Sequence, residues 1–190
     1  MKVKKIISLI LLISISIILV GCGNKSETTS QQNSNTQPNS TTANAEAYDK
    51  GYLEISDEEI KGMEKMNCTR EATGEGNSEV NLSYTLYYQG EYLQLLHSKE
   101  EIITDDQDIL DEYQTAYINI YKHYENLEYY DTSVIRTKNS VTNDTVINYN
   151  KIDTDKLLEI EGEEDNIIKD GKVKLDDWLD FAEQFGTKCE

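Results

Sequence analysis

The chain has 190 residues, and its 36 acidic residues against 18 basic ones give a formal net charge of −18. So acidic a chain is repelled by nucleic-acid phosphates and by anionic lipid head groups. We therefore exclude nucleic acid as a partner, and we expect no basic patch to hold the protein at a membrane.

The first 21 residues have the pattern of an export signal. Three lysines precede an apolar run from Ile6 to Val20, which is shorter than the ~20 residues of a membrane-spanning helix. Leu19-Val20-Gly21-Cys22 follows, with small residues directly before a cysteine. The alternative is an ordinary cleaved signal peptide followed by an accidental cysteine.

This pattern resembles the lipobox of bacterial lipoproteins. The resemblance implies that residues 1–21 are removed and that Cys22 carries a diacylglycerol (and so acyl chains such as palmitate) on its sulfur. Two acyl chains give stable anchoring. The predicted location is the extracytoplasmic face of the cell membrane, and the Asn-, Ile-, Lys- and Tyr-rich composition favours a Gram-positive bacterium.

Residues 22–50 are predicted to form a disordered tether. Ser, Thr, Asn and Gln dominate this segment, and it has too few apolar side chains to offset the entropy of ordering. Residues 51–65 are predicted to form a short helical lead-in, because Ser56 and Glu59 have the spacing of a capping box.

Residues 66–190 are predicted to form a single domain that begins with a β-hairpin. Apolar residues alternate with polar ones from Val80 to Gln89, which predicts a strand with one buried face. A turn at Gly90 leads into a partner strand over 92–103. Apolar positions at helical spacing over 109–124, preceded by three aspartates, then predict an amphipathic helix.

The second half of the domain repeats this order. Strands are predicted over 128–137 and 141–151, followed by a helical turn that Asp153 could cap, an acidic loop over 159–165, and a last amphipathic helix over 175–185 that Gly186 ends. The predicted fold class is α+β: an antiparallel sheet built from two hairpins, with two amphipathic helices packed on one face.

Cys68 and Cys189 are predicted to form a disulfide that closes this domain. Once Cys22 is lipidated they are an even pair in an exported protein, and they lie near the two ends of the domain. In the chain-entropy model such a bond stabilises the fold by ~4–5 kcal/mol. The alternative is two free thiols; a catalytic cysteine is disfavoured because there is no Cys-x-x-Cys motif.

The order of elements resembles the YehR-like family of small bacterial lipoproteins, which contain a domain of unknown function. The segments that carry the resemblance are Tyr84–Gly90, the aromatic-rich helix Tyr113–Tyr124, Val146–Asp153, and Lys169–Leu175 with Phe185-Gly186. The resemblance implies an exported, lipid-anchored α+β domain with a cysteine at each end. It adds no catalytic residue.

Two candidate cation sites are weaker than their structural alternatives. Asn166 to Asp177 has the length of a calcium loop, but Ile168 occupies a ligand position, and a turn at Asp170-Gly171 explains the residues better. The acidic cluster within 159–165 could bind divalent cations weakly, or it could be a solvated surface.

No motif in the chain points to catalysis. His97 and His123 lack companions at metal-ligand spacing, and no nucleophile elbow, P-loop or dinucleotide fingerprint is present. Tyr113, Tyr117, Tyr121 and Tyr124 form a stripe that predicts core packing, or an aromatic binding patch if the sheet leaves part of it exposed.

These observations favour a membrane-anchored, non-catalytic binding or envelope-associated module without cofactor or metal, whose ligand could be a protein, a peptide or a glycan. Two alternatives remain: a cell-wall-directed enzyme that uses a pair of carboxyl groups, and a weak divalent-cation-binding envelope protein.

Overall fold

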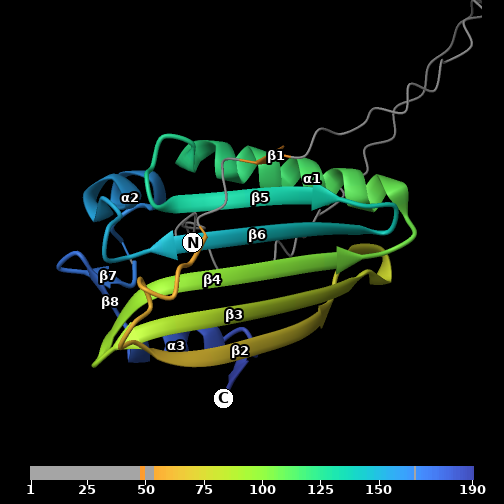
Figure 1. Cartoon of the computed structure of the whole chain (residues 1–190). Helices are drawn as coiled ribbons and strands as arrows, with labels where there is room; N and C mark the ends of the chain where they lie inside the picture. Colours follow the sequence, from red (N-terminus) through yellow and green to blue (C-terminus); the bar gives the residue numbers. More distant parts are fainter. Residues whose placement is uncertain (1–47, 50–53, 165) are drawn as a thin grey trace, which may run out of the picture.

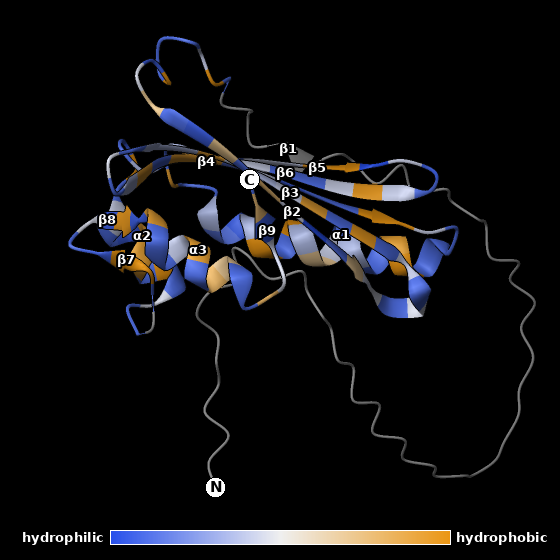
Figure 2. Cartoon of the chain, turned by 90° about the horizontal axis from the view of Figure 1, so that it is seen from below, coloured by the Kyte–Doolittle hydropathy of each residue, from blue (hydrophilic) through white to orange (hydrophobic). Residues whose placement is uncertain are grey.

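The computed structural model describes residues 48–49, 54–164 and 166–190, which form an antiparallel nine-stranded sheet with helices on one face (Figures 1 and 2). From one edge to the other, the main path of strands is β1 (Tyr48–Asp49), β5 (Tyr130–Arg136), β6 (Ser140–Asn148), β4 (Tyr92–Ile103), β3 (Glu79–Gln89), β2 (Glu64–Thr73) and β9 (Lys188–Cys189). A small hairpin of β7 (Ile168–Lys169) and β8 (Lys172–Lys174) pairs with the start of β4.

The two predicted hairpins are confirmed as the centre of the sheet. β3 pairs with β4, β5 pairs with β6, and β4 pairs with β6 to join the two hairpins. The alternation read from the sequence holds: Val80, Leu82, Tyr84 and Leu86 of β3 are buried, while the residues between them are exposed or half-buried. The α+β class is therefore confirmed.

The helices α1 (Gln107–Tyr121), α2 (Thr154–Glu161) and α3 (Leu175–Glu183) lie on the same side of the sheet (Figure 2). The Asp106 carboxylate caps α1 by accepting from the backbone N–H of Asp108 at 3.0 Å. No helix in the described part of the chain combines the length and the apolar character that a membrane span needs.

The tyrosine stripe packs in the core, as its helical spacing predicts. Tyr113, Tyr117, Tyr121 and Tyr124 are all buried against the sheet. Tyr124 stacks on Tyr130 of β5 with ring centroids 4.3 Å apart. The alternative of an aromatic patch made from this stripe is wrong, because the sheet covers all four rings.

α2 is longer than the helical turn expected at Asp153. Asp153 caps it as predicted, accepting from the backbone N–H of Lys156 at 3.1 Å. The helix continues to Glu161 because Leu157 is buried and anchors it. The first residues of the expected acidic loop over 159–165 are therefore helical, and the domain has a third helix.

The helical lead-in expected over 51–65 does not form in its described part, residues 54–65. The capping-box bonds are present, with the Glu59 N–H donating to the Ser56 hydroxyl at 3.3 Å. Turns follow instead of a helix, because Gly62 adopts φ +80° and the chain enters β2 at Glu64. Figure 1 shows this segment crossing the side of the sheet away from the helices.

Two residues of the segment expected to be a tether take part in the sheet. Tyr48 and Asp49 form β1 and pair with Val134 and Ser133 of β5. Disorder over the whole of 22–50 is therefore wrong at these two positions. Cys22 and the signal segment 1–21 lie outside the described residues.

The predicted disulfide is present. Cys68 of β2 is bonded to Cys189 of β9, which joins positions 121 residues apart. β9 pairs with β2 at this point, so the covalent bond and the strand pairing hold the same two segments together.

Candidate functional site

The face of the sheet opposite the helices, here called the open face, carries the surface features that could bind a ligand. Because side chains alternate between the two faces of a strand, odd-numbered residues of β2 and β3 point to the open face and even-numbered ones to the helices. The pairing register then brings Glu71, Asn81 and Glu101 into one row across β2, β3 and β4.

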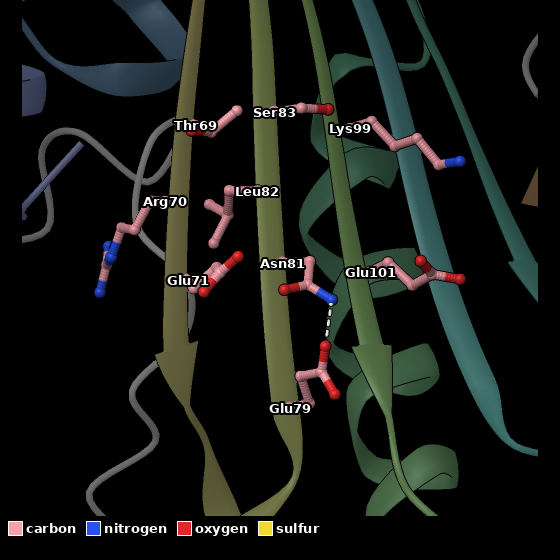
Figure 3. Close-up of a pocket in the computed structure, with 9 residues that line it drawn as sticks. All are labelled: Thr69, Arg70, Glu71, Glu79, Asn81, Leu82, Ser83, Lys99 and Glu101. Carbon is pink, nitrogen blue, oxygen red and sulfur yellow. Dashed lines mark hydrogen bonds between the residues drawn. The ribbon is translucent and has the colours of Figure 1, made fainter. Parts of the chain in front are cut away.

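A shallow depression of about 360 Å³ lies over these three strands (Figure 3). Its lining consists of Thr69, Arg70, Glu71, Glu79, Asn81, Leu82, Ser83, Lys99 and Glu101. The Asn81 side-chain amide donates to the Glu79 carboxylate at 2.7 Å, which fixes one wall. None of the lining residues is aromatic, so the depression offers charge and hydrogen-bonding groups rather than a stacking platform.

The charges on the depression are predominantly negative. Glu71, Glu79 and Glu101 contribute three carboxylates, and Lys99 contributes an ammonium group that extends toward β6, away from Glu71 (Figure 3). Arg70 also borders the depression, but it is an even-numbered residue, and its side chain points away from the carboxylates in Figure 3. A cationic group would therefore be favoured above the row of carboxylates.

His97 and Asp144 form a second polar feature of the open face. His97 Nε2 lies 2.7 Å from an Asp144 carboxylate oxygen, between the adjacent strands β4 and β6. Both side chains are partly buried, with 29% and 24% of their surfaces exposed. The sequence contained no sign of this pair, because strand register decides which residues meet and the two lie 47 positions apart.

Two buried carboxyl groups face the interior instead. Glu100 of β4 lies on the helix side, and burial raises its pKa to about 7, although the neighbouring Tyr117 side chain and the Arg70 charge favour the ionised form. Burial also raises the pKa of Glu161 to about 7, against the opposing effect of Asn166, which donates to its carboxylate at 3.0 Å.

The proposed calcium loop forms a hairpin turn. Asp170 and Gly171 both have positive φ, 51° and 70°, as a type I′ turn between β7 and β8 requires. Asn166 is buried, and its side-chain oxygen accepts from the Ile168 N–H at 2.9 Å. Within the described ranges no three His, Cys, Asp or Glu side chains are arranged to hold a metal ion.

The other candidates do not converge on one site. Glu159, Glu163 and Glu164 are exposed, Glu161 turns into the protein, and Asp165 is outside the described residues. His123 is exposed at the end of the α1 region, far along the chain from the His97 pair. The raised-pKa carboxyl groups and the depression thus lie on opposite sides of the sheet.

The sequence matches no protein-family model, and no curated protein matches it. Two solved structures match this chain in the structural comparison. The NMR structure of the YehR protein from Escherichia coli is 14% identical over 67% of this chain and 92% of that one, with a TM-score of 0.50. An NMR structure of a protein from Streptococcus pneumoniae TIGR4 is 11% identical over 90% of this chain and 100% of that one, with a TM-score of 0.46.

The similarity to YehR shows that this chain has a YehR-like fold. At 14% identity it concerns the fold alone, so family membership and the lipid anchor stay predictions from the sequence.

Proposed function

We propose that this protein is a non-catalytic binding module, anchored by lipid at Cys22 on the extracytoplasmic face of the membrane, and that it binds its ligand on the open face. The observation that carries the proposal is the polar depression over β2, β3 and β4. Binding sites are concave and present convergent polar groups that fix the orientation of the ligand, and this depression has both features.

The placement of the acids supports binding over hydrolysis. A carboxylate pair for glycoside hydrolysis needs one acid with a raised pKa beside the substrate. Glu100 and Glu161 have raised pKa values, but both are directed into the protein, while the depression carries other carboxylates.

The anchoring half of the proposal is tested by labelling cells with a radioactive or clickable palmitate analogue. The wild-type chain should carry the label and partition with membranes. Cys22→Ser should carry none and be released, and an unlabelled wild-type chain would contradict the anchor.

The binding half is tested by sedimentation of the purified full chain with isolated cell envelopes. Glu71→Gln/Glu79→Gln/Glu101→Gln should reduce the retained fraction. The matched control Glu159→Gln/Glu163→Gln/Glu164→Gln removes the same charge from exposed positions outside the depression and should leave retention unchanged. Equal retention of both variants, or release of soluble envelope fragments by the wild-type chain, would contradict the proposal.

A further inference from the structure

The outer edge of β2, on the side away from β3, is only partly covered. β9 pairs with β2 at Cys68 and Thr69, and Glu190 exchanges two backbone hydrogen bonds with Asn67. From Arg70 to Thr73, no strand of the described chain lies beside this edge. β2 nevertheless continues in regular pairing with β3 over these four residues.

The free part of the edge has backbone groups directed outward. The Asn67 N–H donates to the Glu190 carbonyl at 3.1 Å, and the Glu190 N–H donates to the Asn67 carbonyl at 2.9 Å. Because backbone groups of a strand alternate in direction with a period of two, Glu71 and Thr73 present their N–H and C=O to the same outer side as Asn67. Both residues are exposed, so a further strand could reach them.

The free edge opens directly onto the depression, because Arg70 and Glu71 belong to both. In an antiparallel strand added here, the residues that bond to Glu71 and Thr73 would place their side chains on the open face. Long basic side chains at these positions would reach the carboxylates of Glu71 and Glu79. Glu101 lies on β4, three strand spacings of ~4.8 Å away, and adds to the negative charge of the depression. The intervening side chains would lie on the helix side, near Arg70, where a second cation is disfavoured.

We propose that the outer edge of β2 from Arg70 to Thr73 binds an extended basic peptide by antiparallel strand addition, with alternate Lys or Arg side chains over the carboxylates of the depression. Main-chain hydrogen bonds supply affinity, and the alternate side chains supply specificity. The inference rests on the proposed binding function and names the ligand class. A peptide is favoured over a glycan because the free edge offers a row of backbone groups and the depression offers no aromatic ring.

The test measures fluorescence anisotropy of the labelled peptide Lys-Val-Lys-Val-Lys-Val-Lys with the purified full chain in detergent at low salt. Two matched peptides separate strand addition from charge attraction. Methylating the lysine backbone nitrogens removes the N–H groups that face β2, whereas methylating the valine nitrogens modifies those that face away. The proposal expects binding by the parent and valine-methylated peptides and at least about tenfold weaker binding by the lysine-methylated peptide, a loss of about 1.4 kcal/mol.

Variants of the protein complete the test. Thr73→Pro removes an outward N–H without touching the pairing to β3 and should weaken binding by about tenfold. Glu71→Gln/Glu79→Gln/Glu101→Gln should weaken it by a similar factor, and Glu159→Gln/Glu163→Gln/Glu164→Gln should not. Unchanged urea denaturation of each variant shows that the fold is intact.

The outcomes separate the inference from the proposed function. Equal affinity of the two methylated peptides, or full binding by Thr73→Pro, would overturn strand addition. Absence of any peptide binding would overturn the basic-peptide ligand, while envelope retention that still depends on the depression would leave the open-face function standing. If peptide binding is absent and envelope retention does not depend on the depression either, both the strand-addition inference and the proposed open-face function are overturned.

Discussion

The two faces of the sheet are built from the same strands but have opposite chemistry. Glu100 and Glu101 are neighbours in β4: the first is 9% exposed against the tyrosines of α1, and the second borders the depression on the open face. On the helix side, polar groups are buried among apolar and aromatic side chains, and some are hydrogen-bonded to one another, as with Asn143, which donates to the Tyr121 hydroxyl at 2.7 Å. On the open face they form a charged surface.

The difference shows how one run of alternating residues can serve stability and binding separately. Substitutions on the helix side should change the free energy of unfolding and leave binding intact until the fold fails. Substitutions on the open face should do the reverse. The predictions below test this separation from the largest effect to the smallest.

Trp178→Ala should cause the largest loss of stability, about 3–5 kcal/mol, because Trp178 is completely buried and packs edge-to-face on Tyr84 at 5.4 Å. Urea denaturation followed by circular dichroism measures it. Ile135→Ala on the open face is the matched control: its side chain is 50% exposed, and a loss of no more than about 0.5 kcal/mol is expected. Comparable losses would contradict the separation of the faces.

Removing the disulfide by Cys68→Ser/Cys189→Ser should lower stability by roughly 2–5 kcal/mol, because the unfolded chain regains the freedom of a 121-residue loop, for which the chain-entropy model gives the upper end of this range. Wild-type protein denatured in the presence of a reductant should match this variant. If the wild-type protein keeps its full stability in reductant, the pairing of β2 with β9 holds the two segments together without the disulfide.

Glu100→Gln should remove part of the pH dependence of stability. The pKa of Glu100 is raised to about 7 in the folded protein from an ordinary value of 4.5, so the folded state holds this proton more tightly. The associated stability is fully present below pH 4.5 and is lost as the pH rises through about 7. Between pH 5 and pH 8, the free energy of unfolding of the wild type should therefore fall by roughly 2–3 kcal/mol more than that of Glu100→Gln.

Urea denaturation at a series of pH values measures this difference. Glu101→Gln, one residue away on the open face, is the matched control for the loss of one carboxyl group. Glu161→Gln should remove a comparable portion of the pH dependence, because burial raises that pKa to about 7 too. A Glu100→Gln variant with the wild-type profile would show that Glu100 is ionised in the fold without cost.

Glu79→Gln should have the smallest effect on stability, within about 0.5 kcal/mol, because the residue is exposed and its bond to Asn81 lies on the surface. The same change should weaken binding of the basic peptide measurably. Urea denaturation and peptide anisotropy on one preparation give both numbers, and a large loss of stability with unchanged binding would reverse the roles of the faces.

Much of the fold could be predicted from local patterns. Period-two alternation placed β3, and the turn signal at Gly90 placed its partner β4, each within a residue of the observed bounds; helical spacing placed α1 and α3. The pair of cysteines in a chain predicted to be exported pointed to the disulfide. Each of these predictions uses the residue pattern within one segment or the number of cysteines in the chain. None of them depends on which strands pair or in which register.

The site could not be predicted in this way, because it depends on register between strands. Glu71, Asn81 and Glu101 share a row only because β2, β3 and β4 pair as they do, and the His97–Asp144 pair has the same origin. The turns at 54–63 show a different limit: the capping box at Ser56 formed its bonds, yet Gly62 and the pairing of β2 decided the backbone beyond it.

The bond between Cys68 and Cys189 also sets how the domain responds to force. A pull between the chain that precedes β2 and the C-terminal end passes through this covalent link, so the 121-residue loop between the cysteines carries no tension and cannot be drawn out. Single-molecule stretching should therefore show almost no extension until reductant is added, after which the whole loop lengthens.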